Sequence, residues 1–383
     1  MSTNLKGILW LMMTGALACG FLHHVVAPEQ INFERLHIFL FNLCSGGTLL
    51  VYYTEGQNRL GPRSRLFLLL ALAFAVSAFL HWYGLALCLA LVLSGVVERV
   101  RVEHFGSLVP RALFSACEPV SRKFHQAALL CLSIGLAMSS VVMLNSAYLH
   151  WWHIEKLKLD TFFLGFSFPV SLISMSVIFS LMQRATSNAV KALKEAAFWV
   201  INLGVIIFFL FILANMFRAQ VLIATALFVA VASVFWLYWR LGMRLQQKTF
   251  LSSGILFLLI TSITGIAYIM LSMSAYYISQ YSQPLLRLHA FTALYGWNLS
   301  GLIVIGRHDD FPLQLHSSKI IALHWLTVLM LCPLGYFLPP FAVLAVLSYG
   351  LLLWMLLFNR GTVDGALRQG QREQLQADSS WRP

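Results

Sequence analysis

Two histidines lie inside apolar stretches of the chain in the same local sequence. His37 follows Arg35 and His289 follows Arg287, each with one leucine between them. Neutral imidazole is a good ligand for haem iron, and a buried haem needs one or two such ligands from facing helices. An arginine two residues earlier in the chain lies nearer to water, where it can pair with a haem propionate. The same pattern is equally typical of two histidines that bond to backbone or water between packed helices.

Glycines follow both histidines within about three helical turns. Gly46 and Gly47 come after His37, and Gly296 comes after His289. Small residues thin a helix and let a flat group or a neighbouring helix approach closely. Both histidines are therefore predicted on helices with a close neighbour.

The elements that must hold these residues are membrane helices. The chain has 383 residues, of which 59% are hydrophobic and only 10% are charged. Soluble domains carry about 25% charged residues, so a water-facing surface is impossible to cover here. This composition excludes a soluble enzyme, a disordered chain and a disulfide scaffold. The net charge of +12 is not gathered on a soluble basic domain, so no nucleic-acid partner is expected.

Apolar runs of about 20 residues predict an all-α bundle of twelve transmembrane helices in one domain, residues 1–358. The predicted spans are 7–27, 36–54, 66–82, 83–98, 125–148, 161–183, 197–217, 219–239, 249–276, 285–306, 320–338 and 340–358. With alternating spans and a cytoplasmic N-terminus, 21 of the 26 basic residues fall on the cytoplasmic side, as the positive-inside rule expects. Both termini are then cytoplasmic, and residues 359–383 form a polar tail that we expect to be disordered.

Short stretches in these spans resemble subunit I of the heme–copper oxidases, and most closely the C-family enzymes. His37 before Gly46-Gly47 is similar to the haem-ligand helix of that family, and His289 before Gly296-Trp297 is similar to its tenth helix. The twelve-span plan agrees along almost the whole chain. NnrS-like proteins are another haem-containing group with this plan.

The chain departs from the family at the copper centre. That centre needs three histidines from the sixth and seventh helices, but this chain has no histidine between His153 and His289, and Ala197 stands where the family has one. The match places His289 on the active-site haem ligand and Phe291 on the second ligand position. Three alternatives then remain. His37 and His289 share one haem, or each contacts a separate site, or one of the two no longer serves as a ligand. The family's arginine pair is also missing, and Arg35 and Arg287 are candidates to replace it.

The resemblance implies a haem b protein without copper, in which oxygen reduction by the family's mechanism is not expected. Its implied role is electron transfer, or the handling of nitric oxide or another small ligand, in a bacterial cytoplasmic membrane. A cytochrome c, a quinone or other respiratory subunits are the implied partners, besides the lipid bilayer. His37 and His289 are the implied iron ligands, and Arg35 and Arg287 the implied cofactor-binding arginines.

Two alternatives stay open. Twelve spans with cytoplasmic ends are also the plan of major-facilitator transporters, and the loop 56–65 resembles the signature loop of that family, with Asn58 in place of its aspartate. The connection between the sixth and seventh spans is short for such a transporter, and few charged residues lie deep in the spans. The other alternative is a non-catalytic assembly or partner subunit of a respiratory complex.

Overall fold

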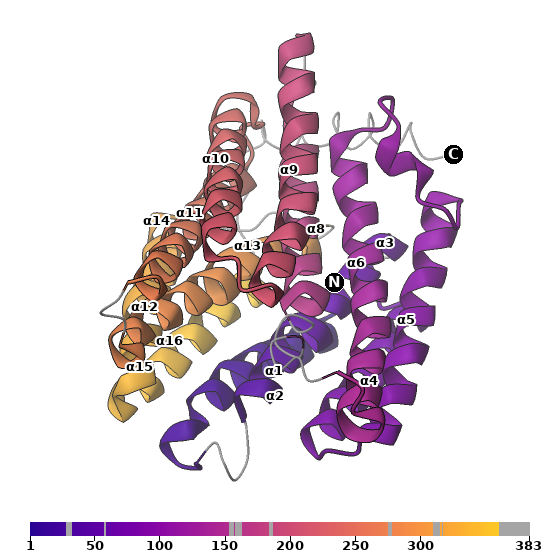
Figure 1. Cartoon of the computed structure of the whole chain (residues 1–383). Coiled ribbons are helices and arrows are strands. Elements are labelled where there is room, and N and C mark those ends of the chain that lie inside the picture. The colour runs from indigo at the N-terminus through magenta and orange to yellow at the C-terminus, as the bar shows by residue number, and fades with distance from the viewer. Residues whose placement is uncertain are drawn as a thin grey trace.

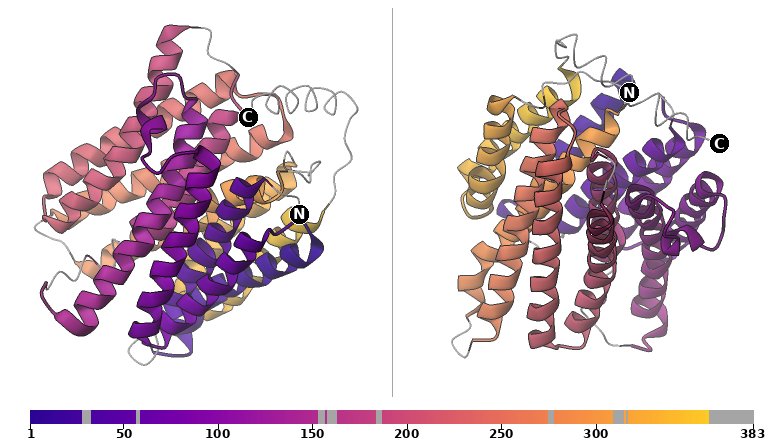
Figure 2. Two further views of the ribbon diagram at one scale, coloured as in Figure 1. Left: turned by 90° about the vertical axis from the view of Figure 1, so that its right-hand side faces the viewer. Right: turned by 90° about the horizontal axis from the view of Figure 1, so that it is seen from above.

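A computed structural model describes residues 1–27, 33–56, 59–152, 157, 163–183, 187–274, 278–308, 315 and 317–359. This part of the chain is helical and contains no β-strand, only an isolated bridge between Met182 and Gly242. The helices form one bundle, seen from three directions in Figures 1 and 2. The all-α prediction is confirmed. The predicted cytoplasmic tail, from residue 360 on, lies outside the described residues.

The elements follow one another along the chain as helices of α, 3-10 and π type. In the first half they are α1 (Thr3–Phe21), η1 (Leu22–His24), α2 (Phe33–Ile38), η2 (Phe39–Gly47), α3 (Thr48–Glu55), α4 (Pro62–Phe79), α5 (Tyr83–Phe105), η3 (Arg111–Phe114), α6 (Val120–Leu144), η4 (Asn145–Leu149), η5 (Phe163–Ser167) and α8 (Phe168–Ser180). In the second half they are α9 (Asn188–Leu213), α10 (Phe217–Leu241), α11 (Gln246–Ser272), α12 (Ser279–Phe291), η6 (Thr292–Asn298), α13 (Leu299–Gly306), α14 (Ser318–Leu326), η7 (Thr327–Leu331), α15 (Cys332–Phe337) and α16 (Pro339–Phe358).

Ten helices in the described part of the chain are long and apolar enough to cross a membrane. They correspond to ten of the twelve predicted spans. The fourth predicted span lies in α5, which is helical but not among the ten, and whose last two turns carry charged residues. The sixth is represented, within the described residues, by the shorter apolar helix Gly165–Ser180. The protein is therefore a multi-pass membrane protein, and the predicted number of twelve spans is not confirmed by the described residues.

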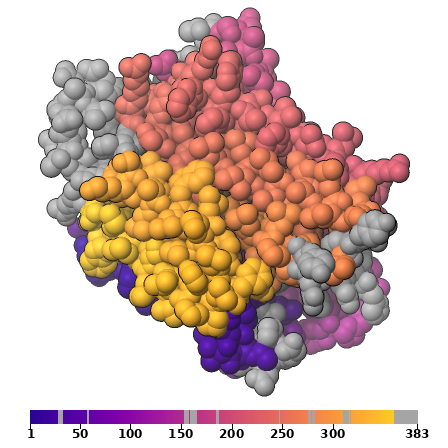
Figure 3. Space-filling view, turned by 90° about the vertical axis from the view of Figure 1, so that its left-hand side faces the viewer, coloured from indigo at the N-terminus to yellow at the C-terminus, as the bar shows by residue number. Residues whose placement is uncertain are grey.

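The two spans that carry the candidate histidines lie at the centre of the bundle. In the apolar windows of Phe33–Glu55 and Ser282–Gly306, 72% and 78% of the residues are buried, whereas only 28% are buried in α9 and in α10. The first and last membrane helices, α1 and α16, pack against each other, and the indigo and yellow ends of the chain adjoin in Figure 3. The first two spans, Thr3–His24 and Phe33–Glu55, thus pack among helices from both halves of the sequence.

Wide π-helical turns interrupt both central spans. The segment η2 begins two residues after His37, and η6 begins three residues after His289. A polar cluster joins them: the amide Nδ2 of Asn298 lies 3.4 Å from Oδ1 of Asn42 and 3.1 Å from Oγ of Ser167. Ser167 is the last residue of η5, which is also π-helical, so Asn298 of η6 contacts both η2 and η5. Because π turns inside α-helices occur frequently at functional sites, this crossing is a candidate functional region.

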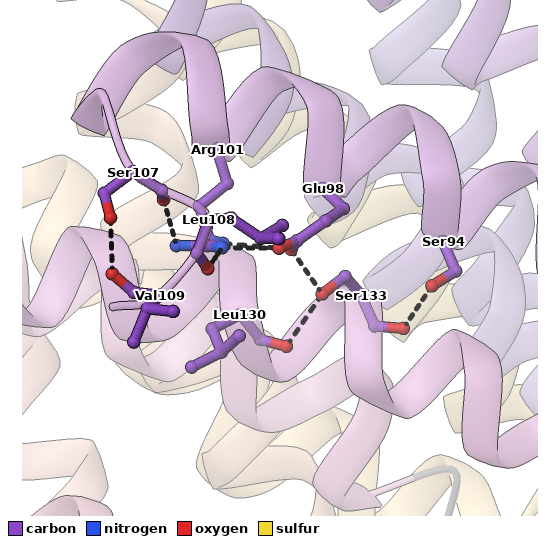
Figure 4. A network of polar contacts seen from close by, with 8 residues as sticks. All are labelled: Ser94, Glu98, Arg101, Ser107, Leu108, Val109, Leu130 and Ser133. Carbon is purple, nitrogen blue, oxygen red and sulfur yellow. Dashed lines mark hydrogen bonds and ion pairs between the residues drawn. The ribbon is translucent and has the colours of Figure 1, made fainter. Parts of the chain in front are cut away.

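A buried arginine organises the predicted cytoplasmic end of α5 (Figure 4). The Arg101 side chain has no exposed surface and forms a bidentate ion pair with Glu98. Its guanidinium also donates to the carbonyls of Ser107 and Leu108, at 3.4 and 2.6 Å, and Ser133 of α6 donates to Glu98 at 3.2 Å. The Arg101 guanidinium therefore connects the turn after α5 to α5 itself and, through Glu98, to α6. Each of its three nitrogens has a hydrogen-bond partner.

A second ion pair at this end is exposed. Glu103 accepts a hydrogen bond from Arg99 at 3.0 Å and lies 2.5 Å from Arg63 of α4. The hydrogen bond from Arg99, with the positive charges of Arg63 and Arg99, holds the pKa of the Glu103 carboxyl below its ordinary value. Such exposed pairs contribute little to stability because water and salt screen them. The buried Arg101 group is the stronger constraint on this end of the bundle.

Candidate functional site

His289 is held by one ring nitrogen only. Its Nδ1 lies 2.9 Å from the backbone carbonyl oxygen of Thr261 in α11, and because a carbonyl only accepts, Nδ1 carries the proton. The neutral ring then has its lone pair on Nε2, which has no hydrogen-bond partner among the described residues. A Cβ added to Gly265 would lie 3.0 Å from Cε1 of the ring. The glycine therefore lets the imidazole lie directly against α11.

His37 is also held through Nδ1, but by a side chain. The hydroxyl of Tyr295 lies 3.0 Å from that nitrogen, and the two rings meet edge to face at 5.6 Å. A Cβ added to Gly20 of α1 would lie 2.6 Å from the same nitrogen. The imidazole therefore packs between α1 and η6. Glycine is required at position 20 because any larger residue would displace the ring.

The structure does not bring the two histidines together. His37 faces α1 and the tyrosine of η6, whereas His289 faces α11, and no hydrogen bond or ring contact in the described part of the chain joins the two imidazoles. Their environments are nonetheless alike: each lies on the second helix of a hairpin, against a glycine of the first, before a π-helical segment. Whether the two residues contact one haem or separate sites stays a prediction.

The two arginines before the histidines differ. Arg287 forms an ion pair with Glu34 of α2 at 3.2 Å, and its guanidinium carbon lies 3.9 Å from the ring centre of Tyr336. Arg35 is exposed on α2. A propionate at Arg287 would therefore share that guanidinium with the Glu34 carboxylate. The ion pair also joins α2 to α12, so Arg287 connects the helices of the two histidines.

The fit of these residues to a haem differs between the two positions. Histidine ligands of metals almost always donate their second ring nitrogen to a carbonyl, carboxylate or water, which fixes the tautomer and the ring orientation. His289 has that arrangement, with Nε2 as the available ligand atom. At His37 the Tyr295 hydroxyl, which both donates and accepts, lies against Nδ1, and the ring also has a backbone hydrogen bond with Ala16. Within the described residues, no group of three or more His, Cys, Asp or Glu side chains is placed to hold a metal ion.

Tyr295 is not among the residues predicted from the sequence, although it contacts most of the region. Its ring is fully buried and contacts Phe41 and Tyr349 at 5.0 Å each. Its backbone carbonyl lies 2.7 Å from Nε2 of His324, whose Nδ1 is buried without a partner. Tyr295 stands beside Gly296 in the stretch that resembles the oxidase helix, but no local pattern pairs it with His37, 258 positions away.

Comparison with known proteins adds no relative to this picture. No protein family, no curated protein and no solved structure matches the chain.

Proposed function

We propose that this protein is a haem b-binding membrane protein with a twelve-span plan related to subunit I of the heme–copper oxidases and without a copper centre. The observation that carries the proposal is the arrangement of His289, whose Nδ1 donates to the Thr261 carbonyl and whose Nε2 has no partner in the described chain. A bound haem would supply one-electron transfer or the binding of a small ligand such as nitric oxide.

The residues around His289 have separable tasks in this proposal. The Thr261 carbonyl keeps the proton on Nδ1, so the lone pair stays on Nε2. Gly265 sets the position of the ring against α11. Arg287, which is already paired with Glu34, is the nearest candidate in sequence for a propionate. For His37, the hydrogen bond to Tyr295 supports a positioning role between α1 and η6 rather than a second ligand on the same iron.

The test is an absorption spectrum of the detergent-purified protein, oxidised and dithionite-reduced, with a pyridine haemochrome count. The wild type, expressed with ample haem, is expected to show a b-type spectrum that His289→Ala abolishes and that His81→Ala, a change at an exposed histidine, leaves intact. His37→Ala is expected to retain haem. Gly265→Ala presses on the ring and is expected to shift the absorption bands without removing them.

The opposite results separate the alternatives. A wild type without colour under these conditions would refute the haem proposal. Co-purification with a larger respiratory complex would then favour an assembly or partner subunit, and substrate uptake in vesicles would favour a transporter. Loss of haem in His37→Ala but not in His289→Ala would move the ligand to the other hairpin.

A further inference from the structure

The C-terminal ends of α1 and α15 meet at one imidazole. Nδ1 of His23 lies 3.0 Å from the carbonyl oxygen of Gly20, and Nε2 of the same ring lies 2.9 Å from the carbonyl oxygen of Tyr336. Both carbonyls belong to last turns of helices, where backbone oxygens have no partner within the helix. His23 therefore caps its own helix and a second helix more than 300 positions away.

The chemistry of these atoms selects one protonation state. A carbonyl oxygen only accepts hydrogen bonds, so both ring nitrogens of His23 must donate. Neutral imidazole has one N–H, whereas imidazolium has two. We infer that His23 is a proton-controlled clamp, which joins α1 to α15 when its ring is protonated and gives up the bond to one of them when the ring is neutral.

The groups around the His23 ring do not take over its hydrogen bonds to the Gly20 and Tyr336 carbonyls. The rings of His24 and Tyr336 lie 4.2 and 4.4 Å from that of His23. His24 donates through Nε2 alone to the Gly335 carbonyl at 2.8 Å, which a neutral ring also does. The charged groups on the neighbouring helices are Glu34 and Arg287, which pair with each other beside Tyr336, together with Arg35, exposed on α2.

The clamp lies next to the candidate site but does not depend on haem. Gly20, which accepts from His23, is the residue against which the His37 ring packs. Tyr336, which also accepts, lies under Arg287, two residues before His289. Release of the clamp is therefore expected to loosen this end of the bundle, where α1, α12 and α15 meet, while the rest of the fold is kept.

Hydrogen exchange measured by mass spectrometry tests the clamp on the full-length protein in detergent. The peptide that covers residues 332–338 reports on the end of α15. After correction for the intrinsic effect of pH on exchange, its protection is expected to fall roughly tenfold from about pH 5 to about pH 8, because a hydrogen bond from a charged group is lost.

Three variants separate His23 from its neighbour. His23→Gln places one donor and one acceptor in the ring's position and is expected to show low protection at both pH values. His23→Arg is charged at both and is expected to stay protected at both. His24→Gln still donates to the Gly335 carbonyl and is expected to keep the wild-type dependence on pH. A wild type with equal protection at both pH values, or a His23→Arg variant that keeps the wild-type dependence, would overturn the clamp.

Discussion

Replacing Arg101 with leucine is expected to lower the free energy of unfolding by about 1–3 kcal/mol, the cost of leaving the partners of a buried group unsatisfied, since the Glu98 side chain is 30% exposed and keeps part of its hydration. The Arg101 side chain is fully buried, and its loss leaves the Glu98 carboxylate without its bidentate partner. The carbonyls of Ser107 and Leu108 lose their donor at the same time. The turn after α5 then loses its connection to α5 through the Arg101 side chain.

The matched control is Arg99→Leu, two positions earlier on the same helix. The Arg99 side chain is 73% exposed and pairs with Glu103 at the surface, so we expect a change of less than about 1 kcal/mol. Denaturant titration of both variants in detergent measures the difference. Equal destabilisation by the two substitutions would show that Arg101 acts as an ordinary surface charge.

Replacing Gly135 with alanine is expected to destabilise the fold by about 1–3 kcal/mol, because it inserts a methyl group where two backbones touch. A Cβ at Gly135 of α6 would lie 2.3 Å from the Cα of Gly165 in η5. Backbone has no rotamer with which to move away, so α6 and η5 must separate. Small residues at such crossings are what allow membrane helices to pack closely.

Gly95→Ala controls for the change in helix propensity. Gly95 lies in the middle of α5, and a Cβ there would meet no atom within 4 Å. Alanine is favoured over glycine in a helix by about 1 kcal/mol, so this variant is expected to be neutral or more stable. The two alanine variants are compared by thermal unfolding in the same detergent. A Gly135→Ala variant as stable as Gly95→Ala would contradict the close approach of α6 and η5.

The membrane class and the positions of most helices follow from the sequence because the bilayer makes them a local property. Each backbone polar group in lipid must be satisfied within its own segment, so about 20 apolar residues suffice to predict a span. Ten predicted spans meet that measure in the structure. The two others lie in α5, which is helical but not among the ten, and at Gly165–Ser180, which is apolar but shorter within the described residues.

The partners of the candidate site residues were decided by the tertiary structure. The sequence shows two equivalent Arg-Leu-His stretches, yet His37 bonds to the Tyr295 hydroxyl and His289 to the Thr261 carbonyl. Arg287 pairs with Glu34, which lies in the other hairpin. Apolar side chains are as well solvated by lipid as by one another, so hydropathy carries no information about which helices meet. That choice depends on close packing at glycines and on a few polar contacts between distant segments, and these exist only once the bundle has assembled.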